Sequence, residues 1–116
     1  MERHTRLRQS ADFERVRREG RSWPHPLLVL AACANGLDYT RVGIAASRSV
    51  GQAVARNRAR RLLRETTRQL YHGLSPGWDV VLIARPGILE VKQPQVQEVV
   101  LALARRAGLM AQERGQ

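Results

Sequence analysis

The chain has 116 residues, which fits one domain and predicts a single modest hydrophobic core rather than two. Its 20 Lys and Arg residues outnumber its 10 Asp and Glu residues, and the net charge of +10 predicts a polyanionic partner. A single cysteine, Cys33, excludes an intrachain disulfide, while the lack of an apolar N-terminal signal or of any apolar run near about 18 residues predicts a cytoplasmic protein without a membrane span.

The first third of the chain is expected to contain a lead-in and a short helix. Residues 1–9 are mostly polar and basic, and we expect them to be flexible. Ser10 is a plausible N-cap for a helix over 11–19, with Phe13 and Val16 on one face and Gly20 at its end.

Two apolar runs of strand length follow a proline-rich break. They span residues 27–33 and 40–47, with Asn35-Gly36 in the polar connection between them. We expect these two strands to pair as an antiparallel hairpin.

The second half of the chain alternates helix, strand and helix. A helix is predicted over 53–72, a buried strand over 79–84, and a last helix that opens at Pro94, where a proline costs least. We expect one domain over 10–109 and a frayed tail over 110–116.

The helix predicted over 53–72 has one apolar face and one cationic face. At about 100° per residue, the apolar side chains fall within a narrow arc that should face the core, namely Ala59, Leu62, Leu63, Thr66 and Leu70. A second arc collects Arg56, Asn57, Arg60, Arg61, Arg64 and Arg68. Like charges four residues apart repel by a few tenths of a kcal/mol per pair, and Glu65 alone cannot balance them, so phosphate binding explains this strip better than a solvated face does.

The same region carries a specific motif. It contains Arg41-Val42-Gly43-Ile44-Ala45-Ala46-Ser47-Arg48, then Val50-Gly51, then the run from Ala53 to Glu65 with Arg56-Asn57-Arg58 inside it. These runs resemble the signature segment of bacterial ribonuclease P proteins, whose core is arginine-asparagine-arginine. Further matches extend the resemblance to about residues 5–109: Arg6-Leu7-Arg8, Ser10, Asp12-Phe13, Gly20 and residues 79–85.

The resemblance implies an α+β fold, a single-domain α/β sandwich with elements in the order αβββαβα. Its four-stranded sheet would include a left-handed βαβ crossover around the signature segment, against the usual right-handed rule. The sequence pattern alone supplies three helices and three strands. The fourth strand is therefore expected to be a short one near residues 21–23.

The resemblance also implies a function and two surfaces. The chain would be the protein subunit of the endoribonuclease ribonuclease P, which removes the 5′ leader of precursor tRNA. Its catalytic RNA would contact Arg48, Arg56, Asn57, Arg60, Arg61 and Arg64. A cleft between the first helix and the sheet would bind the leader, with Phe13 stacking on a base and Arg17 beside it.

The leader cleft is expected to be poor in aromatic side chains. Arg17 and Ala31 stand where relatives often carry aromatic residues, and Thr67 replaces another. Phe13 has core packing as an equally plausible role.

No catalytic residue is expected in this chain. His4, His25 and His72 lie in polar or proline-rich segments without triad or ligand spacing, and the acids of the first helix more simply balance its arginines. The resemblance implies that the holoenzyme requires Mg²⁺ held mainly by the RNA, without a covalent cofactor. It also implies a monomeric protein bound 1:1 to the catalytic RNA; metal sites on the protein stay open.

Two other classes of function remain to be discriminated. A general RNA-binding protein, such as a ribosomal protein, would show the same charge and arginine helix but not the motif or a dependence on the leader. An independent nuclease would need a carboxylate cluster for its metal ions, and the sequence shows none.

Overall fold

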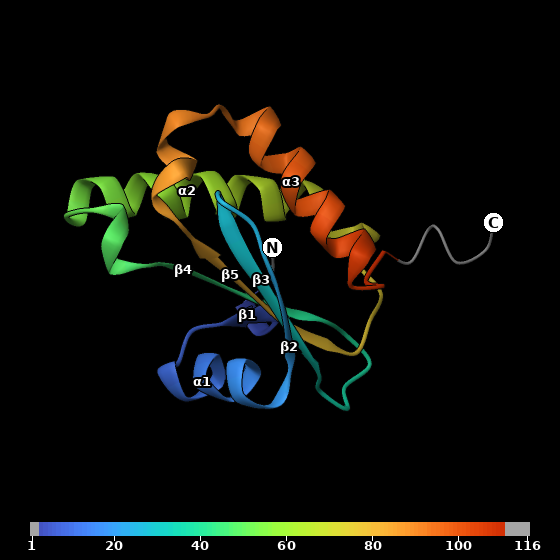
Figure 1. The fold of residues 1–116 in the computed structure, drawn as a ribbon. Helices are drawn as coiled ribbons and strands as arrows, with labels where there is room; N and C mark the ends of the chain where they lie inside the picture. Colours follow the sequence, from blue (N-terminus) through green and yellow to red (C-terminus); the bar gives the residue numbers. More distant parts are fainter. Residues whose placement is uncertain (1–2, 111–116) are drawn as a thin grey trace.

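The computed structural model describes residues 3–110, and Figure 1 shows its chain path. One mixed sheet runs through the molecule, with its strands in the order β1-β4-β5-β3-β2. β4 and β5 are parallel, β1 is parallel to β4, and β3 is antiparallel to both β5 and β2. The strands are β1 (Arg6–Leu7), β2 (Arg21–Pro24), β3 (Leu28–Ala34), β4 (Arg41–Ala46) and β5 (Trp78–Ala84).

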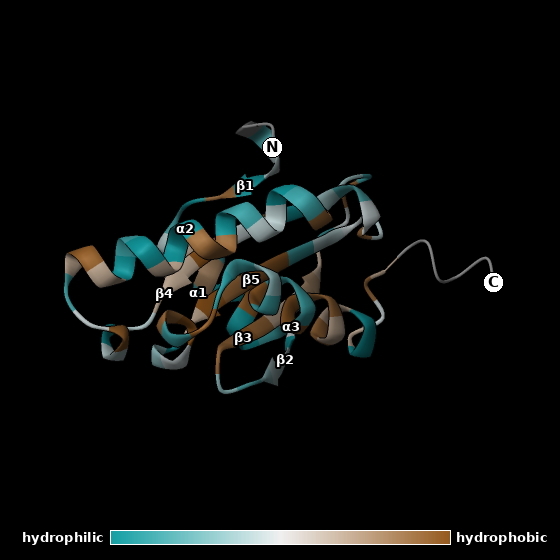
Figure 2. Ribbon diagram, turned by 90° about the horizontal axis from the view of Figure 1, so that it is seen from above, coloured by the Kyte–Doolittle hydropathy of each residue, from teal (hydrophilic) through white to brown (hydrophobic). Residues whose placement is uncertain are grey.

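Three helices cover the two faces of this sheet. α1 (Ser10–Glu19) lies on one face, while α2 (Ala53–Leu70) and α3 (Gln93–Arg106) lie on the other (Figures 1 and 2). Each face of the sheet is apolar where a helix covers it, so the molecule has two hydrophobic cores, and the prediction of a single core is wrong.

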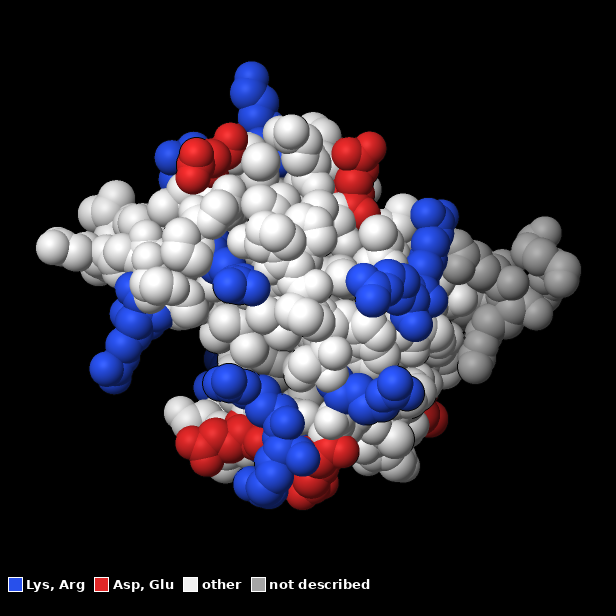
Figure 3. All heavy atoms as spheres, viewed as in Figure 1, with Lys and Arg blue, Asp and Glu red and all other residues white. Residues whose placement is uncertain are grey.

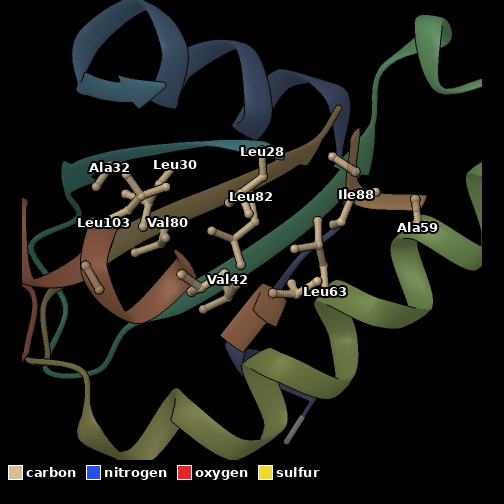
Figure 4. Packing of buried hydrophobic residues seen from close by; sticks show 14 of the residues in the cluster. Leu28, Leu30, Ala32, Val42, Ala59, Leu63, Val80, Leu82, Ile88 and Leu103 are labelled. Atoms are coloured by element: carbon tan, nitrogen blue, oxygen red, sulfur yellow. The ribbon is translucent and has the colours of Figure 1, made fainter. Parts of the chain in front are cut away.

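Alternation along the strands builds these two cores. In β3, Leu28, Leu30 and Ala32 face α2 and α3, and they pack with Leu63 and Leu103 in the larger core (Figure 4). The residues between them face α1, where a smaller core contains Leu7, Val16, Ala31, Cys33 and Val81. The small core fixes the position of α1 and therefore of the side chains on that helix.

The α1 helix ends where the chain must pass close to the sheet. A Cβ added at Gly20 would lie 2.2 Å from the carbonyl oxygen of Ala32, so any larger residue would push the end of the helix away from β3. At the other end Gln9, and not Ser10, occupies the N-cap position, because the helix begins one residue earlier than predicted.

The expected fold class is confirmed. The chain forms a single α+β domain, the short strand expected near residues 21–23 is β2, and β4, α2 and β5 form the parallel βαβ unit. Figure 2 views the sheet from the side of α2. When this view is turned so that β4 and β5 run upward, β5 lies to the left of β4, and the crossover is therefore left-handed.

The predicted hairpin is wrong. β3 and β4 run in opposite directions, but β5 lies between them and forms hydrogen bonds with both. An apolar run shows that a strand is buried but not which strand lies beside it. In this order β3 lies between β5 and β2, and β4 lies between β1 and β5, so each has a paired strand on both edges. A two-stranded hairpin would leave one edge of each strand unpaired.

The sheet has five strands rather than the expected four. The extra strand is β1, within the segment expected to be a flexible lead-in, where Thr5 and Leu7 are buried. Two residues are too few to show a period, so the sequence alone does not reveal the strand. The element order therefore begins with β1 before the expected αβββαβα series.

The far end of the described chain is also held in place. Met110, expected to belong to a frayed tail, is 6% exposed and forms an isolated bridge with Leu74. Residues 111–116 of that predicted tail lie outside the described residues. Within residues 3–110, none of the helices has the length and hydropathy needed to cross a membrane.

Candidate RNA-binding site

A groove of about 750 Å³ lies between α1 and the ends of β4 and β5. Phe13 and Arg17 of α1 line it together with Arg48 and Arg56, which lie just before and within α2. Four of the eight candidate residues therefore share one concave surface, although they are up to 43 positions apart in the chain. We call this surface the α1 groove.

Parallel pairing of β4 and β5 explains why basic residues meet in the groove. Ala46 and Ala84 are paired at the carboxyl ends of these strands, and the Ser47 amide donates a hydrogen bond to the Ala84 carbonyl at 3.1 Å. The residues that follow each strand consequently emerge side by side, which places Arg48 and Arg85 at the same groove.

Arg85 is a groove residue that the sequence analysis did not select. Its guanidinium donates a hydrogen bond to the His25 carbonyl at 3.3 Å, while the rest of the exposed side chain lines the groove. The available signal was an arginine directly after a buried strand, but it becomes informative only when β5 is known to lie parallel to β4.

Phe13 both packs and lines the groove. Its half-buried ring contacts the smaller core, and it lies so close to β4 that a Cβ on Gly43 would be 2.7 Å from the ring. The glycine in this strand thus makes room for the aromatic ring. Phe13 therefore contributes to the smaller core and also lies on the groove wall, while its role toward the leader stays a prediction.

Ala31 and Thr67 do not line the α1 groove. Ala31 is fully buried beneath α1, and Thr67 is buried on the opposite side of the sheet, in the α2 interface. Val29 and Ile83 supply the apolar part of the groove wall instead. Phe13 is the only aromatic residue among those that line the groove within the described chain.

The predicted division of α2 into two faces is confirmed. Ala59, Leu63 and Thr66 are fully buried against the sheet, while Asn57, Arg61 and Arg64 are exposed. In Figure 2 this helix shows alternating hydrophilic and hydrophobic bands along its length. Arg60 donates a hydrogen bond to the Oδ1 atom of Asn57 at 2.6 Å, which holds the two side chains together on the exposed face.

The six candidate RNA contacts divide among three places. Arg48 and Arg56 belong to the α1 groove, and the Arg56 guanidinium donates to the Ala46 carbonyl at 3.4 Å. Asn57 and Arg60 lie on the α2 surface. Arg61 and Arg64 face hollows on the β1 side of the helix.

A buried carboxylate fastens α1 to the sheet. Asp79 at the start of β5 is fully buried, and it accepts hydrogen bonds from Arg41 Nε at 2.9 Å, Arg41 Nη2 at 2.8 Å and Asn35 Nδ2 at 3.0 Å. Arg15 of α1 forms an ion pair with the same carboxylate and also donates to the Cys33 thiol at 3.2 Å. Phe13 and Arg17 flank Arg15 in α1, so this contact helps to set their place at the groove.

These contacts determine the protonation state of Asp79. Burial alone would raise the pKa of Asp79, but the hydrogen bonds from Arg41, Asn35 and Arg15 together lower it below its ordinary value. The same bonds raise the pKa of Arg15 and Arg41. The carboxylate is therefore ionised and fully engaged, which makes it a structural group and not a free acid.

The acids at the two ends of α1 and the imidazole of His25 have local partners. Asp12 lies 3.8 Å from Arg15, and Glu19 pairs with Arg18 at 3.2 Å. His25 Nδ1 accepts a hydrogen bond from the Leu27 amide at 3.0 Å. Among residues 3–110, no group of three or more His, Cys, Asp or Glu side chains is arranged to hold a metal ion.

Charge is unevenly distributed over the surface. On the face that carries α3 and the β2 edge, basic and acidic groups are separated by wide neutral areas, and acidic groups mix with basic ones over α1 at the bottom (Figure 3). The lining of the α1 groove contains one acid, Glu14, beside Arg17, Arg48, Arg56 and Arg85, and α2 carries one acid, Glu65. Fold and site together define a small basic α+β protein with a cationic helix beside a basic groove.

Comparison with known proteins identifies the family. The ribonuclease P family model matches residues 1–108. The ribonuclease P protein component of Herpetosiphon aurantiacus is 45% identical over 109 residues, covering 94% of this chain and 89% of that protein. That of Roseiflexus sp. is 44% identical over 118 residues, covering 100% of this chain and 97% of the relative.

Solved structures agree with these sequence relatives. The ribonuclease P protein of Staphylococcus aureus superposes with a TM-score of 0.80 at 28% identity, covering 91% of this chain and 97% of that one. The protein from Thermotoga maritima gives a TM-score of 0.75 at 33% identity, with coverage of 86% and 96%. The chain belongs to the ribonuclease P protein family and is a protein component of this tRNA-processing enzyme.

Proposed function

We propose that this chain binds the catalytic RNA of ribonuclease P through the exposed face of α2 and the 5′ leader of precursor tRNA through the α1 groove. Both contacts promote endonucleolytic removal of the leader, which leaves the mature 5′ end of the tRNA. The RNA performs the chemistry, and no side chain of this protein takes part in bond cleavage.

The α1 groove is the observation that carries this proposal. It joins Phe13, a ring on which a base can stack, to the cationic side chains of Arg17, Arg48 and Arg56. A single-stranded nucleic acid needs both features, because stacking is tolerant of sequence while arginine forks bind the phosphates. The leader is the single-stranded part of the substrate.

The protein would act in two ways: its charge raises the affinity for RNA, and its contacts with the leader position the substrate. Arginines that neutralise phosphates release condensed counterions from the RNA, which supplies affinity without reading sequence. Leader contacts then raise the affinity for precursor over mature tRNA and position the substrate at the catalytic RNA. The protein works as a monomer bound 1:1 to that RNA in the cytoplasm.

Magnesium belongs to the RNA in this account. The holoenzyme requires Mg²⁺, which supplies the activated water and stabilises charge in phosphodiester hydrolysis. Three acids of α1 and β5 do not suit an ion: Asp79 is occupied by Arg15, Arg41 and Asn35, and Asp12 and Glu19 lie beside arginines. We therefore assign the metal ions mainly to the RNA, with no covalent cofactor on the protein.

The leader's contribution to binding tests the groove. The affinity of the RNA–protein complex is measured for precursor tRNA and for mature tRNA, and their ratio reports the leader contacts. Arg17→Gln removes a groove cation and should reduce this ratio about 3- to 10-fold, since one phosphate contact is lost. Arg18→Gln is the matched control, because Arg18 is the next residue of α1, is exposed and lies outside the groove.

Two results would count against the proposal. A wild-type ratio close to one would mean that the protein does not bind the leader, and the general RNA-binding alternative would then be favoured. Equal losses in the Arg17→Gln and Arg18→Gln variants would show that net charge matters and the groove does not.

A further inference from the structure

The β1 edge of the sheet forms a second cationic concavity. One hollow of about 210 Å³ lies between β1 and the C-terminal half of α2, and an adjoining hollow of about 350 Å³ continues along the sheet edge. Arg6 of β1 and Arg64 of α2 line both hollows. We call the two together the β1 cleft; in Figure 2, β1 and α2 lie side by side.

Strand pairing brings the cations of the β1 cleft together. Arg6 pairs with Val42 in the parallel β1–β4 ladder, and Val42 faces α2 in the larger core. Because side chains of paired residues point to the same face of a sheet, Arg6 is directed toward α2. Arg8, two residues further along, lines the same cleft.

The charge of the β1 cleft is largely uncompensated. Among the described residues, Arg6, Arg8, Arg61 and Arg64 form no ion pair. Glu65 is the one acid lining the cleft, and it is engaged by Arg68 at 2.5 Å and by Gln69 at 3.2 Å. Close cations without counter-charges repel one another, and an incoming anion would remove that repulsion.

The β1 cleft is continuous with the two surfaces already described. Arg61, Arg64 and Arg68 belong to the exposed arc of α2, so most of its cations are shared with that face. Phe13 lines both the β1 cleft and the α1 groove and is the only residue common to those two hollows. An RNA strand lying in the β1 cleft would follow α2 and end beside the α1 groove, where we propose that the leader binds.

We propose that the β1 cleft binds the phosphodiester backbone of the catalytic RNA and that Arg6 and Arg8 are phosphate-contacting residues. This inference rests on the proposed function and extends its RNA contact from α2 to the N-terminal strand. The catalytic RNA is the occupant, and the leader is not, because the cleft shares three arginines with α2 and only Phe13 with the α1 groove. Arginine forks contact phosphates without reading bases, so the contact is independent of local sequence.

Binding of the catalytic RNA alone, as a function of salt, tests this inference. The Arg6→Gln/Arg8→Gln double variant should lose about 10-fold in affinity, and the slope of log affinity against log salt should become shallower by about two. Arg106→Gln is the matched control, since Arg106 is an exposed arginine at the end of α3 outside the cleft, and it should change affinity less than about 2-fold.

A charge-preserving variant separates binding from folding. Arg6→Lys/Arg8→Lys keeps both charges, so the salt slope should stay near that of the wild type, with a smaller loss of affinity from the missing guanidinium forks. If β1 were needed only for folding, the Gln and Lys variants would show equal thermal destabilisation and equal loss of binding, which would overturn the inference.

The remaining outcomes distinguish the inference from the proposed function. Wild-type affinity and slope in the Arg6→Gln/Arg8→Gln variant, alongside weakened binding by Arg64→Gln, would overturn the role of β1 and leave the α2 contact intact. A loss seen only with precursor tRNA and not with the catalytic RNA alone would assign the cleft to the leader and contradict our assignment. Absence of binding by the wild-type protein would refute the proposed function itself.

Discussion

At the residue scale, Asp79 connects the parts of the chain that form the α1 groove. Its carboxylate joins Arg15 on α1, Arg41 on β4 and Asn35 after β3, so a single buried charge on β5 is linked to α1, β4 and the connection that follows β3. Asp79 was predicted at the start of a strand, but no pattern in the sequence explains a carboxylate there. Its partners lie 38 to 64 positions away in the chain, and no local pattern connects them.

Replacing this carboxylate should destabilise the protein. Asp79→Asn removes a buried charge and leaves the guanidinium groups of Arg15 and Arg41 without their counter-charge, which should lower the free energy of unfolding by about 2–4 kcal/mol at neutral pH. Urea denaturation measures this loss. Asp38→Asn, which changes an exposed carboxylate, is the control and should stay within about 0.5 kcal/mol of the wild type.

The stabilisation by Asp79 should also depend on pH with a definite sign. The pKa of Asp79 in the folded protein lies below its unfolded value of about 4, so the ionised carboxylate stabilises the fold above that pH. This contribution is lost as the pH falls through the folded-state pKa. The Asp79→Asn variant should therefore show a flatter decline in stability below about pH 4 than the wild type; parallel declines would contradict the assignment.

At the element scale, α2 shows how much a periodic pattern can reveal. Its 18 residues carry a complete apolar face and a complete cationic face, and both were predicted because their spacing follows the helical repeat. The start of the helix at Ala53 was also predicted, although it ends at Leu70 and continues as a short 3₁₀ turn over Tyr71–Gly73. The faces and the start of a helix of this length can therefore be predicted from the sequence.

Which strands lie side by side in the sheet could not be predicted from the sequence pattern. The apolar runs over 27–33 and 40–47 are strands close to those bounds, but the inserted β5 separates them in the sheet. Arg85 was missed for the same reason, since its place beside Arg48 depends on the β4–β5 pairing. The resemblance to the family supplied the fourth strand and the crossover, which periodicity could not supply.

The arginine face of α2 should lower the free energy of unfolding and raise the affinity for the catalytic RNA. Arg64 has Arg60 and Arg68 four residues away on either side, so Arg64→Gln removes two repulsive pairs and should raise the free energy of unfolding by about 0.2–0.5 kcal/mol. The same variant should weaken binding of the catalytic RNA about 3- to 10-fold, with a salt slope shallower by about one. Denaturation and binding titrations measure the two effects, and the exposed Arg106→Gln serves as the control for net charge.

The two effects in Arg64→Gln have opposite signs, which makes them informative. A loss of both stability and binding would indicate that Arg64 is structural. A gain in stability without loss of binding would remove Arg64 from the RNA-contact set.

At the scale of the whole molecule, the fold separates two basic surfaces and joins them at one edge. α1 and the small core support the α1 groove, while α2 and the large core support the arginine face. The ends of the parallel strands β4 and β5 bring both surfaces to the same end of the sheet, although α1 and α2 lie on opposite faces. Under the proposed function, a protein with a net charge of +10 would use these two surfaces to contact two RNA segments close to each other.

Cleavage of a precursor tRNA with a 5′ leader, at low Mg²⁺ concentration, tests the central claim most directly. The catalytic RNA alone, the protein alone and the two together are compared under identical conditions. We expect little cleavage by either component alone and strong stimulation in the mixture, because the protein supplies substrate affinity and charge neutralisation. A mixture no faster than the RNA alone would contradict the subunit role, and cleavage by the protein alone would contradict the assignment of the chemistry to the RNA.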